Sequence, residues 1–168
     1  MLQDGFCEKN RNCILISGRG YPDVATRSLI VKLLQDIPQL LAYVFVDADP
    51  HGLEIANVYI NGSQSLSMYK ELTLDKDSRN KRIKWIGLSL SDLIRLNLSL
   101  KVLVKLSDQD LKKANSLLST SKSPDMSWLR LELEQITLYG YKAEIQALSS
   151  ISVDYVSNVF IPSKIPKY

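Results

Sequence analysis

The stretch Asp47-Ala48-Asp49-Pro50-His51-Gly52 follows an apolar run over 41–46, which reads Leu-Ala-Tyr-Val-Phe-Val. A run this rich in aromatic and β-branched residues predicts a strand that is buried on both faces. Side chains two residues apart on an extended chain point the same way, so Asp47 and Asp49 should project together from the end of this strand. Open α/β sheets bind ligands at that edge. We therefore expect the two carboxylates to form a ligand site.

The chemistry of a close carboxylate pair indicates a divalent metal. The two charges repel each other, and a cation between them relieves the repulsion. Mg²⁺ suits Asp47 and Asp49, because it is often held by one or two carboxylates and keeps water and phosphate oxygens in its other positions. Mn²⁺ accepts the same ligands. The alternative is structural, since Asp-Pro is a common turn and an Asp at a strand end often caps the next helix. The spacing by itself leaves both interpretations open.

Three further blocks accompany the acidic pair. A strand-turn-helix pattern, Ile-Leu-Ile-Ser-Gly-Arg-Gly-Tyr-Pro-Asp-Val-Ala-Thr-Arg, spans 14–27. Trp-Ile-Gly-Leu spans 85–88 and is followed by Ser91-Asp92-Leu93, and Lys-Ala-Glu-Ile-Gln-Ala-Leu spans 142–148. In this order and at this spacing, the blocks resemble the metal-binding (Toprim) half of the meiotic DNA double-strand-break transesterases. These proteins are the eukaryotic relatives of the A subunit of type IIB DNA topoisomerase (topoisomerase VI).

The resemblance implies a fold and a function. The fold would be a single Toprim-like α/β domain over 1–168, with a parallel sheet, helices on both faces and extra C-terminal helices. The function would be double-stranded DNA cleavage by tyrosine transesterification, which initiates meiotic recombination in the nucleus and uses Mg²⁺ or Mn²⁺ at Asp47 and Asp49. The implied partners are DNA, a second copy in a homodimer, other meiotic break-formation proteins and a topoisomerase VI B-like subunit.

Two features of the family have no counterpart in this chain. The nucleophilic tyrosine belongs to a preceding winged-helix domain, so we expect no catalytic nucleophile here. The first metal ligand is a glutamate at a strand end that precedes the strand matching 14–17, and Glu8 has no apolar strand before it. Tyr21 precedes Pro22 in a turn and is expected to pack or to line DNA. We therefore expect a fragment or truncated isoform that does not cleave DNA alone.

Four residues are candidates for DNA contact. Arg19 lies in the glycine turn, where a guanidinium and main-chain N–H groups can bind a phosphate, although the family usually carries lysine there. Arg27 lies further along the expected helix and could instead pair with a carboxylate. His51, the only histidine, is expected beside the metal or against the phosphate, because Mg²⁺ prefers oxygen ligands. Lys142 is the fourth candidate. The basic segment 76–84 is expected to be a solvated loop.

Composition agrees with one globular domain. The chain has 168 residues, 45% hydrophobic and 23% charged, with a net charge of +3, which is too small to prove a nucleic-acid partner. No apolar stretch approaches the roughly 18 residues of a membrane span, so no membrane partner is expected. Cys7 and Cys13 lack metal-ligand spacing.

Periodicity, caps and the family pattern give a path of alternating strands and helices. The expected elements are a strand over 13–17, a helix over 23–36, a strand over 41–47, a helix over 51–61, an irregular segment to about 80, a strand over 82–86, a capped turn at Ser91-Asp92 before a short helix, a short strand over 102–104, a helix from Ser107, a loop over 119–124, and helices over 128–138, 142–148 and 153–160.

Two other functions compete with DNA binding. A phosphotransfer enzyme of the haloacid-dehalogenase type requires Thr or Val after Asp-x-Asp, and Pro50 stands there. A non-catalytic module would bind partner proteins through its helical surface. A thermal shift with Mg²⁺ separates the metal-binding function from the interaction module, and phosphatase turnover would support the haloacid-dehalogenase type.

Overall fold

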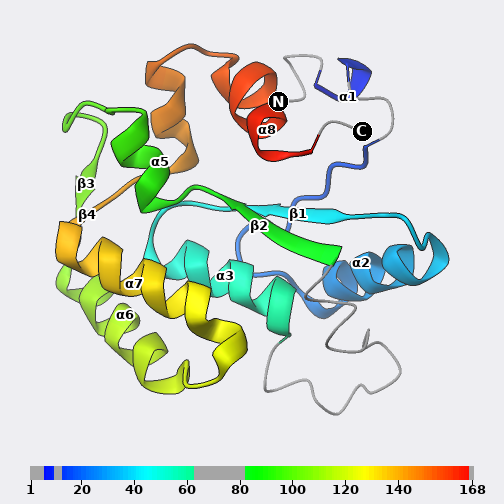
Figure 1. Cartoon of the computed structure of the whole chain (residues 1–168), viewed down its shortest axis with the longest axis horizontal. Helices are drawn as coiled ribbons and strands as arrows, with labels where there is room; N and C mark the ends of the chain where they lie inside the picture. Colours follow the sequence, from blue (N-terminus) through cyan, green and yellow to red (C-terminus); the bar gives the residue numbers. More distant parts are fainter. Residues whose placement is uncertain (1–5, 10–12, 63–81, 167–168) are drawn as a thin grey trace.

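The computed structural model describes residues 6–9, 13–62 and 82–166 (Figure 1). Helices and strands alternate through most of these residues, as the sequence predicts. The elements are α1 (Phe6–Lys9), α2 (Val24–Asp36), β1 (Ala42–Phe45), α3 (Pro50–Asn61), β2 (Ile83–Gly87), α5 (Leu90–Arg95), β3 (Val104–Lys105), α6 (Asp108–Thr120), α7 (Ser127–Tyr139), β4 (Tyr141–Lys142) and α8 (Ile161–Lys164), with 3-10 turns over Pro124–Met126 and Ile145–Ser150 and a π-helical turn over Val156–Phe160.

The parallel pair β1 and β2 forms the centre of the fold. Val44 lies opposite Trp85 in the register, and the backbone pairing continues past the strands, where the Val46 N–H donates to the Gly87 carbonyl at 2.9 Å. The carboxyl ends of both strands therefore meet at one edge. A second, antiparallel pair joins β3 to β4.

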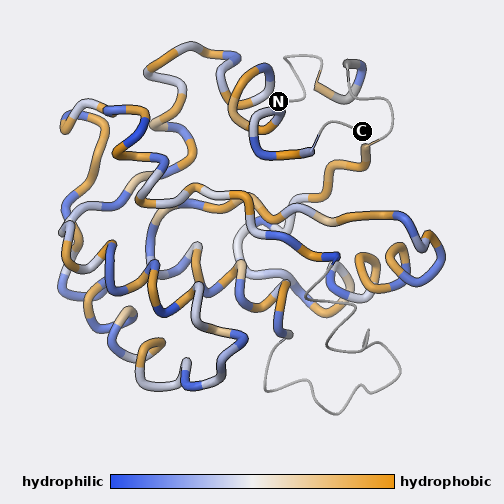
Figure 2. Tube along the Cα trace, in the orientation of Figure 1, coloured by the Kyte–Doolittle hydropathy of each residue, from blue (hydrophilic) through white to orange (hydrophobic). Residues whose placement is uncertain are grey.

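Helices cover both faces of the central pair, as Figure 1 shows. Val44 packs in a buried cluster with Leu34 of α2 and Ile60 of α3. Phe45 points to the opposite face and stacks on Phe160, with ring centroids 5.3 Å apart. This alternation is what strands buried on both sides require. Figure 2 shows the matching pattern, with apolar residues along β1 and alternating apolar and polar turns on the helices. The predicted α/β class is confirmed.

Side-chain caps fix where several helices begin. Asp23 accepts a hydrogen bond from the Thr26 N–H at 2.7 Å and starts α2, and Ser107 starts α6 with Asp110 in a capping box. Both starts agree with the sequence prediction. The cap predicted at Ser91 is wrong, because Ser89 caps α5 and its partner in the capping box is Asp92. The helix therefore begins before the predicted turn.

The strand predicted over 13–17 is not formed. The segment pairs with no strand among the residues described, and Ile14 and Leu15 are 60% and 44% exposed. An apolar run becomes a strand only where a neighbouring strand supplies backbone hydrogen bonds. In the described chain β1 pairs with β2 alone, so that partner is lacking.

The helix predicted over 142–148 is also wrong. Tyr141 and Lys142 pair with β3, and Ala143 exchanges backbone hydrogen bonds with Ala48 at 2.8 and 3.2 Å. These long-range bonds hold the segment extended, and only a 3-10 turn over Ile145–Ser150 follows. The helix predicted over 153–160 is present in part, as the turn over Val156–Phe160 that continues into α8.

Some predictions fall outside the described residues: residues 63–81, which include nearly all of the irregular segment predicted to about 80 and most of the basic cluster, are not described. Glu8 lies in the short helix α1 with its side chain exposed. Within the ranges that the structure covers, no helix has both the length and the apolar character to cross a membrane.

Candidate metal and DNA site

Asp49 serves as the N-cap of α3. Its Oδ1 accepts a hydrogen bond from the Gly52 N–H at 2.6 Å, and Pro50 occupies the first helical position, where no backbone donor is needed. The capping interpretation of this residue is therefore correct. The capping role does not exclude metal binding. A carboxylate has two oxygens with several lone pairs, and the cap uses only one lone pair of one oxygen. The cap also fixes the rotamer in which Asp49 is presented.

Asp47 is held by a different backbone donor. Its Oδ1 accepts a hydrogen bond from the Ile145 N–H at 2.7 Å, across 98 positions of sequence. The backbone bonds between Ala48 and Ala143 lie beside it. The block 142–148 therefore lies directly against the acidic stretch, and the two blocks form one site.

The electrostatics of Asp47 favour a nearby cation. Burial raises the pKa of its carboxyl, and the Ile145 N–H opposes that effect. The carboxylates of Asp49 and Glu144 raise the pKa further, whereas the Lys142 ammonium lowers it, and the net shift is upward. A divalent ion between Asp47 and Asp49 would offset the repulsion between the two carboxylates and lower the pKa of Asp47. The two oxygen donors fit Mg²⁺ or Mn²⁺, although the described residues include no group of three or more metal-ligating side chains. Water and phosphate would have to complete the coordination.

Gly52 brings α3 close to the acidic pair. A Cβ at this position would lie under 3.0 Å from the Asp47 carbonyl oxygen and 3.1 Å from the carbonyl carbon, both of them backbone atoms. Only glycine permits this approach. The N-terminus of α3, where backbone N–H groups carry partial positive charge, is thereby held against the carboxylates.

A polar cluster that the sequence did not reveal lies beside the acids. The Tyr21 hydroxyl donates to Glu54, and its oxygen lies 3.4 Å from the Nδ1 of His51. Lys113 of α6 pairs with the same Glu54 carboxylate at 2.6 Å. Glu54 gave no signal in the sequence, because its partner Tyr21 is 33 positions away.

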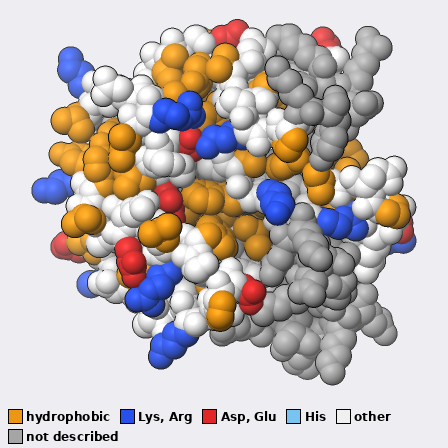
Figure 3. All heavy atoms as spheres, in the orientation of Figure 1, with side chains coloured by type: hydrophobic (Ala, Val, Ile, Leu, Met, Phe, Trp, Pro, Cys, Tyr) orange, Lys and Arg blue, Asp and Glu red, His pale blue; other side chains and the backbone are white. Residues whose placement is uncertain are grey.

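The predicted DNA contacts fall into two groups. Arg19 is exposed, has a left-handed φ of 50°, and makes no ion pair in the part of the chain that the structure describes. His51 is exposed in the first turn of α3. Both side chains are available to a ligand. On the face drawn in Figure 3, lysines and arginines are spread among other side chains without forming one patch.

The other two candidates are engaged in protein contacts. The Arg27 Nε donates to the Asp23 carbonyl at 3.3 Å. The Lys142 ammonium lies 2.9 Å from the buried carboxylate of Asp110. Burial raises the pKa of Asp110, but hydrogen bonds from Lys142 and Ser107 outweigh it and lower the pKa to about 2. A DNA role for Arg27 and Lys142 stays a prediction, as it does for Arg19 and His51.

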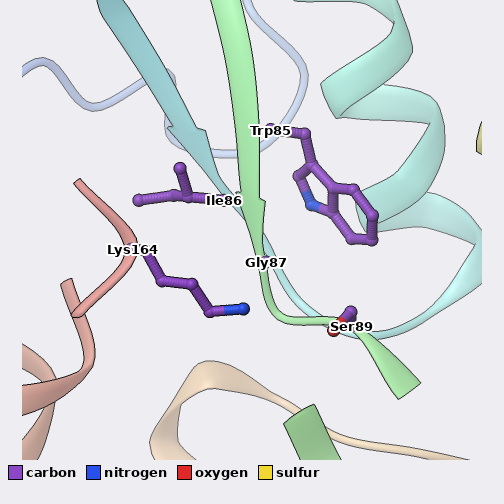
Figure 4. A pocket seen from close by; sticks show the side chains of 5 residues that line it. All are labelled: Trp85, Ile86, Gly87, Ser89 and Lys164. Carbon is purple, nitrogen blue, oxygen red and sulfur yellow. The ribbon is translucent and has the colours of Figure 1, made fainter. Parts of the chain in front are cut away.

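A pocket of about 160 Å³ opens at the end of β2 (Figure 4). It is lined by Trp85, Ile86, Gly87, Ser89 and Lys164. The Lys164 ammonium lies 2.7 Å from the Oδ1 of Asp92, which is buried and also accepts hydrogen bonds from Ser89 and Arg95. Burial raises the Asp92 pKa, but these partners outweigh it and lower the value. This region therefore anchors α8 to the fold.

An Asp-x-Asp pair at the carboxyl end of a parallel strand, flanked by helices and a glycine-turn loop, is the arrangement expected of a Toprim-type domain. The comparison with known families agrees: the family of the topoisomerase 6 A-chain and Spo11 Toprim domain matches residues 1–165. The chain belongs to this family, which confirms the resemblance found in the sequence.

Curated relatives come from both branches of the family. The chain is 41% identical to the meiotic recombination protein SPO11 of Homo sapiens over 166 residues, which cover 98% of this chain and 40% of that protein. It is 39% identical to SPO11-1 of Arabidopsis thaliana, over 98% of this chain and 44% of the relative. The A-chain of DNA topoisomerase 6 from Arabidopsis thaliana is 35% identical, over 91% of this chain and 34% of its own length. The chain thus spans less than half of the length of these relatives.

Proposed function

We propose that this chain is the metal- and DNA-binding Toprim domain of a protein that makes DNA double-strand breaks in meiosis. The observation that carries the proposal is the pair Asp47 and Asp49 at the end of β1, joined to the block 142–148 by the Ile145 N–H. The names of the relatives, which refer to meiotic recombination, support the biological setting. The break would be made in the nucleus, by a homodimer that works with a topoisomerase VI B-like subunit.

Backbone donors hold both carboxylates in place before an ion binds. Asp47 is fixed by the Ile145 N–H and Asp49 by the Gly52 N–H, so neither has to be ordered when the ion arrives. A bound Mg²⁺ or Mn²⁺ would supply charge neutralisation at a DNA phosphate. Arg19, exposed and without an ion pair in the described residues, would add a charge-assisted hydrogen bond to a phosphate oxygen.

Tyr21 is unsuited to the role of nucleophile. Burial and the carboxylates of Glu54 and Asp49 all raise the pKa of its hydroxyl, so that the phenolate is disfavoured. A nucleophilic hydroxyl needs a lowered pKa or an adjacent free base, whereas the Glu54 carboxylate is already paired with Lys113. We propose that Tyr21 is not the attacking nucleophile and that the chain alone does not cleave DNA.

The metal site can be tested with the single histidine as a reporter. His51 is two residues from Asp49, and because it is the only histidine its ring gives one resolved set of NMR signals. Paramagnetic Mn²⁺ at the pair should broaden these signals at low metal concentration, and Asp49→Asn should weaken that effect at least tenfold. Asp36→Asn is the control, since Asp36 is an exposed acid paired with Lys32 on α2. Equal broadening in wild type and Asp49→Asn would refute the site.

A further inference from the structure

A loop formed by residues 17–23, here called the Tyr21 loop, rests on α3 at two points. The Tyr21 hydroxyl donates to Glu54. Further along the helix, Gly18 faces Tyr59 so closely that a Cβ on Gly18 would lie 2.5 Å from the Tyr59 hydroxyl oxygen. Pro22, between these contacts and α2, is buried. The position of the loop therefore depends on α3.

Glu54 is itself held in place from the other side. The Lys113 ammonium of α6 lies 2.6 Å from Oε2 of Glu54, the same oxygen that accepts the Tyr21 hydrogen bond. The side chains of Lys113 and Glu54 are 27% and 23% exposed, so solvent screens this ion pair less than a surface pair. One carboxylate oxygen thus connects the Tyr21 loop to the packed helices α3 and α6.

This connection lies next to the acidic pair. The Asp49 carboxylate is near enough to Tyr21 to raise the pKa of its hydroxyl, and the Tyr21 oxygen lies 3.4 Å from His51. Arg19, two residues before Tyr21, is the loop's exposed cation. Because Arg19 and Tyr21 belong to the same short loop, fixing Tyr21 also limits the positions that the Arg19 side chain can take relative to Asp47 and Asp49.

We propose that Glu54 is a positioning residue for DNA binding: through Tyr21 it sets where Arg19 stands relative to the Asp47–Asp49 pair. Glu54 touches neither metal nor DNA in this role. The DNA part of the inference rests on the proposed function, whereas the positioning of the loop does not.

Because Glu54 is negatively charged, a positioning role and a purely electrostatic role predict opposite effects of its removal on DNA binding. Removal of a carboxylate near a DNA site would, by electrostatics alone, strengthen DNA binding. If Glu54 positions the loop, Glu54→Ala should instead weaken binding of a short duplex in Mg²⁺ by roughly fivefold, the effect of about one lost hydrogen bond. Glu134→Ala is the matched control, because Glu134 forms an exposed pair with Arg130 on α7 and carries the same charge.

A double-mutant cycle separates positioning from a general structural effect. Glu54 and Arg19 lie on different elements, and neither is found paired with the other in the described structure. When the loop is already released by Glu54→Ala, the additional change Arg19→Ala should weaken DNA binding by less than about twofold. Tyr21→Phe, which removes only the hydroxyl, should behave like Glu54→Ala and keeps the test valid if that variant folds poorly. Additive effects of Glu54→Ala and Arg19→Ala would overturn the proposal.

A readout without DNA distinguishes failure of this inference from failure of the proposed function. Amide hydrogen exchange over 17–23 should accelerate in Glu54→Ala and Tyr21→Phe, and the His51 ring signals should shift, whereas Glu134→Ala should leave both unchanged. Unchanged exchange in the loop would overturn the positioning role. A wild-type chain that binds no DNA would refute the proposed function, and the exchange data would then decide the role of Glu54 alone.

Discussion

Substitution of Gly52 by alanine tests whether the approach of α3 to the acidic pair is as close as the structure shows. In wild type, the Gly52 N–H donates to Asp49 Oδ1 at 2.6 Å while its Cα faces the Asp47 backbone. The added methyl would lie under 3.0 Å from the Asp47 carbonyl oxygen. Because the clashing atoms belong to the backbone, no side-chain rotation can relieve the clash, and α3 must move.

The expected cost is the balance of two opposing effects. Alanine is the better helix former, by up to about 1 kcal/mol at an interior position and less in a first turn. Overpacking against a fixed neighbour costs about 1–3 kcal/mol, and distortion of the Asp49 cap costs about 1 kcal/mol more. We expect Gly52→Ala to lower the free energy of unfolding by about 2 kcal/mol. For a domain of this size, that corresponds to a fall in Tm of about 4–8 °C.

Thermal and urea unfolding measure the stability, and the Mn²⁺ titration of the His51 signals measures the site. Gly140→Ala is the control, because Gly140 ends α7 with a φ of 79° and has no atom within 4 Å of an added Cβ. It should cost about 1 kcal/mol through backbone strain alone and leave Mn²⁺ binding unchanged. A Gly52→Ala protein with wild-type stability and wild-type Mn²⁺ affinity would refute the close approach.

The remaining predictions concern pH, cleavage and salt. Because the folded-state pKa of Asp110 is lowered to about 2, its ion pair stabilises the fold above the unfolded value of 3.8, and this contribution should disappear as the pH falls from about 4 to 2. Lys142→Met should reduce that acid dependence in pH-jump unfolding. The isolated chain should not nick supercoiled DNA with Mg²⁺ or Mn²⁺, and a covalent DNA adduct on Tyr21 would contradict this expectation. The combined change Arg19→Ala and Arg27→Ala should reduce the slope of log affinity against log salt by about two if both touch phosphates; an unchanged slope would place the DNA face elsewhere.

Local sequence signals were sufficient for much of the fold. The apolar run before Asp47 became β1, and the start of α6 at Ser107 followed from a capping box within four residues. The helix start at Asp49 follows from Pro50 and an Asp cap in the same way. In each case the signal lies in residues that are close together in the sequence, so the local sequence pattern is enough to predict the element.

Elements that depend on distant partners were predicted less well. The segment 13–17 has the composition of a strand, but in the described structure it pairs with none. The segment 142–148 has the apolar spacing of a helix, yet Ala143 bonds to Ala48 and stays extended. Tertiary backbone bonds outweigh a weak helix preference in a segment this short.

The sequence by itself predicted the family and the α/β class and singled out Asp47 and Asp49 as candidate metal ligands, because these inferences depend on residue types at fixed short spacings. Tertiary structure decided how the acids are held: Asp47 by the Ile145 N–H and Asp49 by its own helix. It also placed Glu54 beside Tyr21, across 33 positions of sequence. The reason is physical, since a hydrogen bond between remote segments depends on how the intervening helices pack, and no local pattern along the chain records that packing.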